Sequence, residues 1–145
     1  MEYRNIVCGV TGSAHAQKAA LEAATLAKRH NANLIYVYAV DITFLRGGFM
    51  LPHQHVEESL EMLGNHILEL AAQIALTQGV TPKKILRRGT VLEVLKTVVR
   101  EEKADLLVLG HEQRTFFEKA LFKGSVEDHV QELKQQTGVD VNVVI

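Results

Sequence analysis

The chain has 145 residues, of which 47% are hydrophobic, which suits one domain with a single core. Sixteen basic and seventeen acidic residues leave a net charge of -1, so the chain lacks the basic face that non-specific nucleic-acid binding requires. The longest apolar runs are much shorter than a membrane span, and no secretory leader precedes Tyr3, so we expect a cytosolic protein. Cys8 is the only cysteine, which excludes an internal disulfide, and its apolar neighbours predict a buried thiol.

The first half of the chain predicts two strands, each followed by a helix. Residues 3–10 form an apolar run that ends in the turn residues Thr11, Gly12 and Ser13. Ser13 can cap a helix from Ala14 to about His30, whose alanine-rich face would let it lie close to a sheet. A second strand is predicted over Leu34 to Val40.

A long amphipathic helix is predicted from about His53 to Gln78. Its apolar residues recur at alternating spacings of four and three: Val56, Leu60, Leu63, Ile67, Leu70 and Ile74. Fewer than four heptads, interrupted by Gly64, favour a helix that lies on a sheet over a coiled coil. Gly79 is expected to end it.

The second half of the chain continues the same alternation. Lys83 to Arg88 predicts a short peripheral strand, and Thr90 to Glu93 is a capping box that opens a helix with Leu92, Leu95, Val98 and Val99 facing inward. A strand buried on both faces ends at Gly110, a helix runs from Ser125 to Thr137, and a last strand covers Val139 to Ile145. Five strands alternating with four helices predict a single three-layer α/β domain over residues 1–145, with a mostly parallel sheet.

A candidate ligand site follows from this order of elements. The loop after Gly110 leaves a buried strand and returns to the start of a helix at Gly124, with Lys123 and Arg114 close by in sequence. The carboxyl ends of parallel strands and the amino ends of helices form the crevice in which open α/β sheets bind anionic ligands. The turn at Thr11 is expected to meet this loop in one shared cleft.

These residues together resemble the universal stress protein family over nearly the whole chain. The resemblance rests on the strand-Gly12-Ser13-helix opening, the alanine-rich first helix, residues 36–41, Gly89, residues 104–110, and Gly124 to Val126. It implies a five-stranded sheet in the order 3-2-1-4-5, like that of the adenine nucleotide alpha hydrolases. It also implies homodimers paired through the last strand, Val139 to Ile145, and a regulatory role in stress responses with at most slow nucleotide hydrolysis.

Many members of that family bind ATP through Gly-x2-Gly-x9-Gly-[Ser/Thr] and an Asp after the first strand. Gly110 and Gly124-Ser125 match the ends of this motif, but Gln113 replaces the middle glycine and the loop has one extra residue. Thr11 stands at the position of the Asp, which removes a charged acceptor for ribose hydroxyls. A bound nucleotide would use the following residues: Thr11, Gly12, Ser13, Val40, Gly110, Gly124, Ser125 and Val126.

Two functions remain open from the sequence. One is a non-catalytic, dimeric regulatory protein in which nucleotide binding is weakened or lost and which acts on a protein partner; no cofactor is then required. The other is a regulatory protein that binds ATP, ADP or AMP. Ordinary helix caps and turns also account for Ser13, Ser125 and the glycines, so none of them alone decides between the two.

Other groups of residues carry weaker hypotheses. His53 and His55 lack a third metal ligand nearby, and His15 and His111 are expected near the mouth of the cleft. The apolar segments 44–51 and 116–122 predict a rim over the cleft or a docking surface, or they pack locally. A phosphoacceptor receiver domain would need acidic residues at the positions where this chain has Thr11 and Gly89, so we set that fold aside. A flavodoxin-like flavin site remains an alternative.

Overall fold

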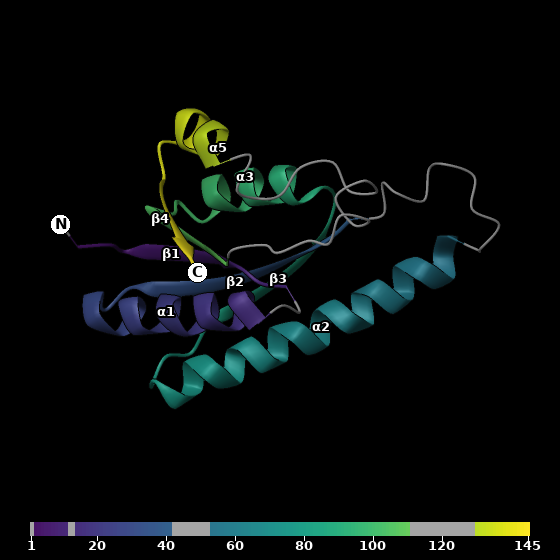
Figure 1. Ribbon diagram of the computed structural model, residues 1–145, viewed down its shortest axis with the longest axis horizontal. Helices are drawn as coiled ribbons and strands as arrows, with labels where there is room; N and C mark the ends of the chain where they lie inside the picture. The colour runs from purple at the N-terminus through teal and green to yellow at the C-terminus, as the bar shows by residue number, and fades with distance from the viewer. Residues whose placement is uncertain (1, 12–13, 42–52, 111–129) are drawn as a thin grey trace.

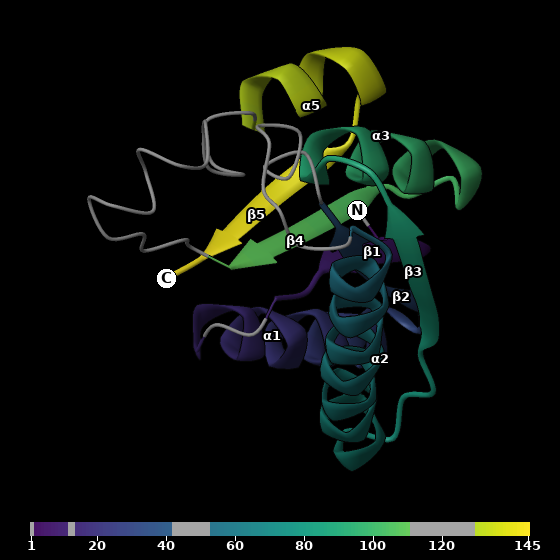
Figure 2. The ribbon, with the colours of Figure 1, turned by 90° about the vertical axis from the view of Figure 1, so that its right-hand side faces the viewer.

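A five-stranded parallel sheet forms the centre of the computed structural model, which describes residues 2–11, 14–41, 53–110 and 130–145. Its strands are β1 (Asn5–Gly9), β2 (Asn33–Val40), β3 (Lys83–Arg88), β4 (Leu106–Gly110) and β5 (Asp140–Val144). The strand order is β3-β2-β1-β4-β5, as the resemblance implied, so β3 and β5 are the two edges of the sheet (Figure 2).

Helices cover both faces of the sheet, which confirms the three-layer architecture (Figure 1). On one face lie α1 (Ala14–His30) and α2 (His53–Thr77), and on the other lie α3 (Val91–Glu101) and α5 (Val130–Thr137). No helix in the described ranges has both the length and the apolar character needed to cross a membrane.

The central strands are apolar on both faces because each face carries its own core. In β1, Ile6 and Cys8 pack toward α1 and α2, whereas Val7 between them packs toward α3. The alanines of α1 are almost fully buried, so this helix lies close to the sheet. Tyr36 of β2 is also buried, and its hydroxyl donates a 2.7 Å hydrogen bond to the Ala20 carbonyl of α1.

The predicted helix ends that lie within the described ranges are found with small shifts, whereas the predicted start at Ser125 lies outside them. The Thr90 hydroxyl accepts a 3.3 Å hydrogen bond from the Glu93 backbone N–H and so caps α3. After α1, Asn31 has φ 53°, and after α2, Gly79 has φ 77°, so both chain reversals use the left-handed region. The first strand begins at Asn5 rather than Tyr3.

The face that α2 turns to the sheet agrees only in part with the predicted one, since Ile67 and Ile74 pack against the core as predicted. Leu68, Ala71 and Ala75 are buried, whereas the predicted inward residues Leu63 and Leu70 are 49% and 43% exposed. Gly64 does not interrupt the helix; a Cβ at this position would lie 2.5 Å from Cδ1 of Tyr38. The helix therefore rests on the sheet through small residues, because glycine and alanine permit a close approach.

The β3 edge is protected by charge, and its side chains alternate between the two faces. Lys84 and Arg88 form ion pairs with glutamates of α2, and Lys83 and Arg87 form ion pairs with glutamates at the end of α3. The hydrogen bond from Arg87 lowers the pKa of the Glu101 carboxyl. Charged side chains of this kind discourage another strand from pairing with the edge.

Candidate functional site

A small pocket lies at the carboxyl ends of β1, β2 and β4, where the sequence predicted the ligand site. Its volume is about 110 Å³. The residues that line it come from three strand ends and two helices: Gly9, Val10, Thr11, Ala16, Val37, Tyr38, Ala39, Val91, Val94, Leu95, Leu109 and Gly110. The pocket extends beyond the expected crevice between β1 and β4, because β2 and α3 supply part of its wall.

The pocket brings together Thr11 and Gly110, which lie 99 positions apart in the sequence. Parallel pairing of β1 with β4 places Ile6 beside Leu106 and Cys8 beside Val108, so both strands end at the same border of the sheet. Thr11 is exposed at this border. The two predicted chain reversals therefore start from one cleft.

Gly110 is needed where β4 meets the first turn of α1. A Cβ on Gly110 would lie 2.6 Å from the His15 carbonyl oxygen and 2.7 Å from the Ala16 nitrogen. Both are backbone atoms, which cannot move aside as a side-chain tip can. The glycine is explained by this close approach, with or without a ligand.

Val40 lies next to the pocket but is not among its lining residues. It is 1% exposed, and its carbonyl accepts a 3.0 Å hydrogen bond from the Gly89 N–H. Gly89 has φ 141°, a conformation that favours glycine, and it leads into α3. The Gly89 turn thus places the start of α3, with Val91 and Val94, against the pocket.

Five predicted site residues lie outside the described ranges: Gly12, Ser13, Gly124, Ser125 and Val126. The apolar segments 44–51 and 116–122, His111 and the Gln113 position also lie there. The hypothesis that the two segments cover one pocket therefore stays a prediction.

The described pocket walls are mostly apolar, and Thr11 and Tyr38 are the lining residues whose side chains carry a hydroxyl. Cys8 is fully buried and burial raises the pKa of its thiol, so it stays protonated and packs as predicted. No three histidine, cysteine or carboxylate residues within the described ranges could together hold a metal ion.

The sequence interpretation missed the pocket residues contributed by α3 and β2. Leu95 was predicted to face inward, and the same helical period could have found Val91, which lies one turn earlier. Nothing in the sequence marks Tyr38 as a pocket residue, because its place depends on how β2 pairs with β1.

A larger groove lies between α1 and α2, on the face of the sheet that these two helices cover. Its volume is about 790 Å³, and its walls include Gln17 and Leu21 of α1 with Leu63, Ile67 and Leu70 of α2. The groove shares Val10, Thr11 and Ala16 with the small pocket, so the two cavities are neighbours.

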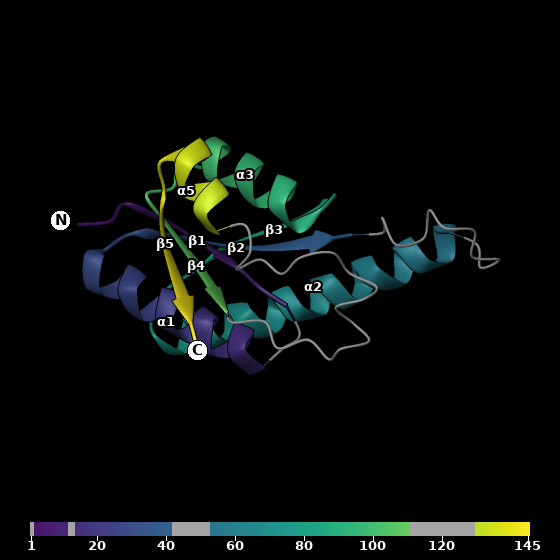
Figure 3. The same cartoon turned by 45° about the horizontal axis from the view of Figure 1, so that its top comes forward.

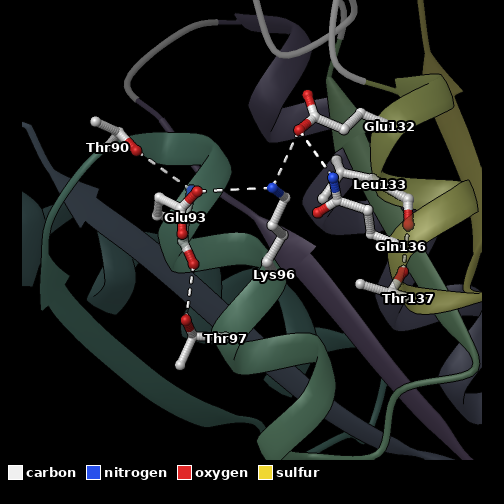
Figure 4. A network of polar contacts seen from close by, with 8 residues as sticks. All are labelled: Thr90, Glu93, Lys96, Thr97, Glu132, Leu133, Gln136 and Thr137. Atoms are coloured by element: carbon white, nitrogen blue, oxygen red, sulfur yellow. Dashed lines mark hydrogen bonds and ion pairs between the residues drawn. The ribbon is translucent and has the colours of Figure 1, made fainter.

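On the opposite face, a buried lysine joins α3 to α5 (Figure 4). Lys96 is 8% exposed, and its ammonium lies 3.2 Å from a Glu132 carboxylate oxygen and 3.6 Å from one of Glu93. Gln136 donates a 3.1 Å hydrogen bond to the same Glu132 oxygen. These contacts hold the described part of the last helix against the helix that lines the pocket.

Comparison with known proteins identifies relatives of this chain. Residues 2–134 match the universal stress protein family. The universal stress protein MJ0531 of Methanocaldococcus jannaschii is 29% identical over 132 residues, which cover 88% of this chain and 75% of that protein.

Solved structures of the same family superimpose over almost the full length. The universal stress protein UspA from Lactobacillus plantarum has a TM-score of 0.76 and 25% identity, with 100% of this chain and 99% of the other covered. A universal stress protein in complex with cAMP has a TM-score of 0.72 and 25% identity, with 99% and 98% covered. Since the family match spans most of the sequence and the sheet has the order seen in these relatives, the chain belongs to the universal stress protein family.

Proposed function

We propose that this chain is a non-catalytic regulatory protein that acts as a dimer and whose crevice binds adenine nucleotides weakly or not at all. The observation that carries the proposal is the pocket at the strand ends, where Thr11, a residue without a carboxylate, stands at the border.

The chemistry of the pocket supports this proposal. A carboxylate beside the ribose would accept charge-assisted hydrogen bonds, which are roughly twice as strong as neutral ones, and Thr11 offers only a neutral hydroxyl. Gly110 serves the contact between β4 and α1, so its presence is not evidence for a phosphate loop.

A second candidate is a regulatory protein that binds ATP, ADP or AMP in this crevice. One observation favours it: the related protein solved in complex with cAMP is 25% identical, and the match covers 99% of this chain. The pocket also lies at the strand ends, where nucleotides bind in open α/β sheets.

Titration calorimetry with ATP, ADP, AMP and cAMP separates the two candidates. We expect wild-type dissociation constants of about 1 mM or weaker, equivalent to about 4 kcal/mol of binding or less. Micromolar binding of any of the four nucleotides by the wild type would reject the first candidate and establish the second.

The variant Thr11→Asp tests the physical reason that we give for weak nucleotide binding. A carboxylate at the border of the pocket restores the charged acceptor, and we expect it to tighten AMP binding about tenfold, or about 1.4 kcal/mol. The matched control is Thr97→Asp, which adds the same charge on the exposed surface of α3 and should change nothing. If both variants bind AMP as the wild type does, the missing carboxylate is not the cause of weak binding.

The two edges of the sheet support the dimer in this proposal. β3 carries four basic residues, whereas β5 has none and continues from Asp140 as Val141, Asn142, Val143 and Val144 to Ile145, which is 80% exposed. Within the described residues, β5 pairs only with β4. An edge strand without basic side chains, whose outward N–H and C=O groups are unpaired within the described residues, is the kind of strand to which a second copy can add.

A further inference from the structure

We propose that Asn142 lies on the two-fold axis of the β5 dimer, where its side-chain amide pairs with the same amide of a second copy and fixes the register of the two strands. The inference rests on the dimer of the proposed function, and it names the residues of the two strands that face each other. The surface concerned is the outer side of β5, beyond which Figures 2 and 3 show no helix or strand of the described residues.

The outward backbone groups of β5 belong to two residues of the strand. The Asp140 N–H donates a 3.3 Å hydrogen bond to the Asp105 carbonyl, so by alternation the backbone groups of Asn142 also point toward β4. The N–H and C=O groups of Val141 and Val143 point the other way. Antiparallel pairing is the arrangement in which the same edge of two copies makes equivalent bonds on both sides of a two-fold axis.

A two-fold axis at Asn142 uses the whole strand. In this register all five residues of Asp140–Val144 face the partner strand. Val141 of each copy lies opposite Val143 of the other, and both residues bond through their N–H and their C=O groups. The register therefore leaves no outward backbone group of β5 without a partner.

The neighbouring register, with the axis at Val141, is weaker because of how the strand begins. It would set Val143 opposite Val139 of the other copy. Val139 is 3% exposed, and its N–H already donates a 3.3 Å hydrogen bond to the Thr137 hydroxyl. Val139 therefore cannot supply the N–H that this register requires.

The side chain at the proposed axis can bond to its own copy. Asn142 would face Asn142 at a non-hydrogen-bonded position of the ladder, where opposite Cα atoms are about 4.5 Å apart and side chains are closest. An amide carries both donor N–H groups and an acceptor oxygen, so two of them can bond to each other. If the axis lay at Val143 instead, each Asn142 would face Val144, and both amides would lose that partner.

The two faces of the paired strands also match. Val141 packs toward the core that lies under α3 and α5, whereas Val144 packs toward the core that lies under α1 and α2. Alternation then places Val143 on the same face as Val141. With the axis at Asn142, Val141 of one copy contacts Val143 of the other, which is a favourable pair of β-branched side chains.

On the α1 face, a hollow beside β5 lies where the partner's strand would end. Val144 of the second copy would come opposite Asp140, which lines the hollow together with Leu26 and Leu106. The two leucines offer an apolar wall to the incoming valine. The Tyr3 hydroxyl donates a 3.2 Å hydrogen bond to the Asp140 carboxylate, so this carboxylate keeps a polar partner when the valine arrives.

Disulfide cross-linking measures the register directly. Cys8 is the only cysteine of the chain and is buried, so a cysteine introduced in β5 supplies the accessible thiol. Under mild oxidation Asn142→Cys should form a covalent dimer on a non-reducing gel, because opposite Cα atoms at about 4.5 Å are within disulfide range. Val141→Cys and Val143→Cys are the matched controls. Each of these cysteines lies two residues along the strand from its own copy, beyond the reach of a disulfide, so neither should cross-link.

The other outcomes of the cross-linking separate the register from the dimer itself. Cross-linking of Val141→Cys or Val143→Cys without Asn142→Cys would move the axis and overturn the inference, although the β5 dimer would stand. Equal cross-linking by all three variants would show that the register is not fixed and would also overturn it. If light scattering shows a monomer, or a dimer that none of the three variants cross-links, the register and the β5 dimer are both rejected.

A charge swap tests the contact between the two side chains. Asn142→Asp and Asn142→Lys each place like charges together at the axis, so each variant alone should dimerise about tenfold more weakly than the wild type. An equimolar mixture of the two should regain the dimer, because opposite charges then face each other. Circular dichroism verifies that each variant is folded.

The matched controls for the charge swap are Thr97→Asp and Thr97→Lys, which add the same charges at an exposed position of α3. Both should dimerise as the wild type does, alone and mixed. If Asn142→Asp and Asn142→Lys also dimerise as the wild type does, the two side chains do not meet at the axis and the inference is wrong.

Discussion

Two glycines show how one missing methyl group sets the distance between elements. Gly110 lets the end of β4 touch the backbone of α1 at His15 and Ala16, and Gly64 lets α2 lie on the ring of Tyr38. From the sequence, Gly110 was interpreted as part of a nucleotide loop and Gly64 as an interruption of the heptad pattern. Their roles depend on which atoms lie opposite, and sequence spacing does not specify that.

We predict that Gly110→Ala destabilises the protein more than Gly64→Ala. At Gly110 the added Cβ meets fixed backbone atoms, so we expect a loss of about 2–3 kcal/mol of unfolding free energy, at the upper end of overpacking costs. At Gly64 the Tyr38 and Leu86 side chains can shift, and alanine gains about 1 kcal/mol of helix propensity, so the net loss should be about 1 kcal/mol or less.

Urea unfolding at one fixed protein concentration measures the free energy of unfolding of both glycine variants. Asn65→Ala, an exposed change on the same helix, is the control and should alter stability by no more than about 0.5 kcal/mol. A smaller loss for Gly110→Ala than for Gly64→Ala would contradict the close contact between β4 and α1.

At the scale of elements, the sequence predicts which segments are strands and helices but not how every helix is turned. Apolar runs located β1, β2 and β4, because buried parallel strands have few polar residues, and short apolar stretches next to turn glycines located the edge strands β3 and β5. The face of α2 was predicted only in part: Ile67 and Ile74 pack against the core, whereas Leu63 and Leu70 are exposed and smaller residues contact the sheet in their place. Likewise, the strand order was enough to place Thr11 and Gly110 near one crevice, whereas the wall formed by α3 could be identified only from the structure.

The pairing of α3 with α5 through Lys96 gives a prediction at this scale. The stem of Lys96 is buried and its ammonium contacts Glu132, so Lys96→Ala should lose both packing and an ion pair, about 1–2 kcal/mol in total. Lys96→Met keeps the stem and should lose about 1 kcal/mol or less, since Glu132 is partly exposed to solvent.

Thermal unfolding at low and high salt measures how much the ion pair between Lys96 and Glu132 contributes to stability. Added salt screens the ion pair, so the difference between the wild type and Lys96→Met should shrink at high ionic strength, whereas the packing loss of Lys96→Ala should persist. The control is Lys134→Met on the exposed side of α5, for which no change is expected. Equal losses for Lys96→Ala and Lys96→Met would show that only the charge matters.

At the scale of the whole molecule, the difference between its two sheet edges predicts how copies associate. The Asp140 N–H donates to the Asp105 carbonyl, which starts the pairing of β5 with β4, so by alternation the N–H groups of Val141 and Val143 point away from β4. Val143→Pro removes one outward N–H and leaves the bonds to β4 in place. We expect it to abolish the β5 dimer, as measured by light scattering after size-exclusion chromatography.

A control variant and a folding check show whether the lost N–H causes the expected loss of the β5 dimer. Asn142 lies between the two outward positions, so Asn142→Ser, which keeps a polar side chain and every N–H, is the control and should remain dimeric. If Val143→Pro is folded and its dimer is as stable as that of the wild type, copies do not pair through this strand.

The charged residues along β3 have a consequence for growth by strand addition. If copies pair through β5 as we propose, the first partner occupies the only sheet edge of the described residues that lacks basic side chains, so growth by strand addition stops at two copies. A sheet open on both sides could extend without limit and seed fibrils, as heterologous contacts do when they fail to close. A protein that pairs in this way can accumulate to high concentration without extending its sheet from copy to copy.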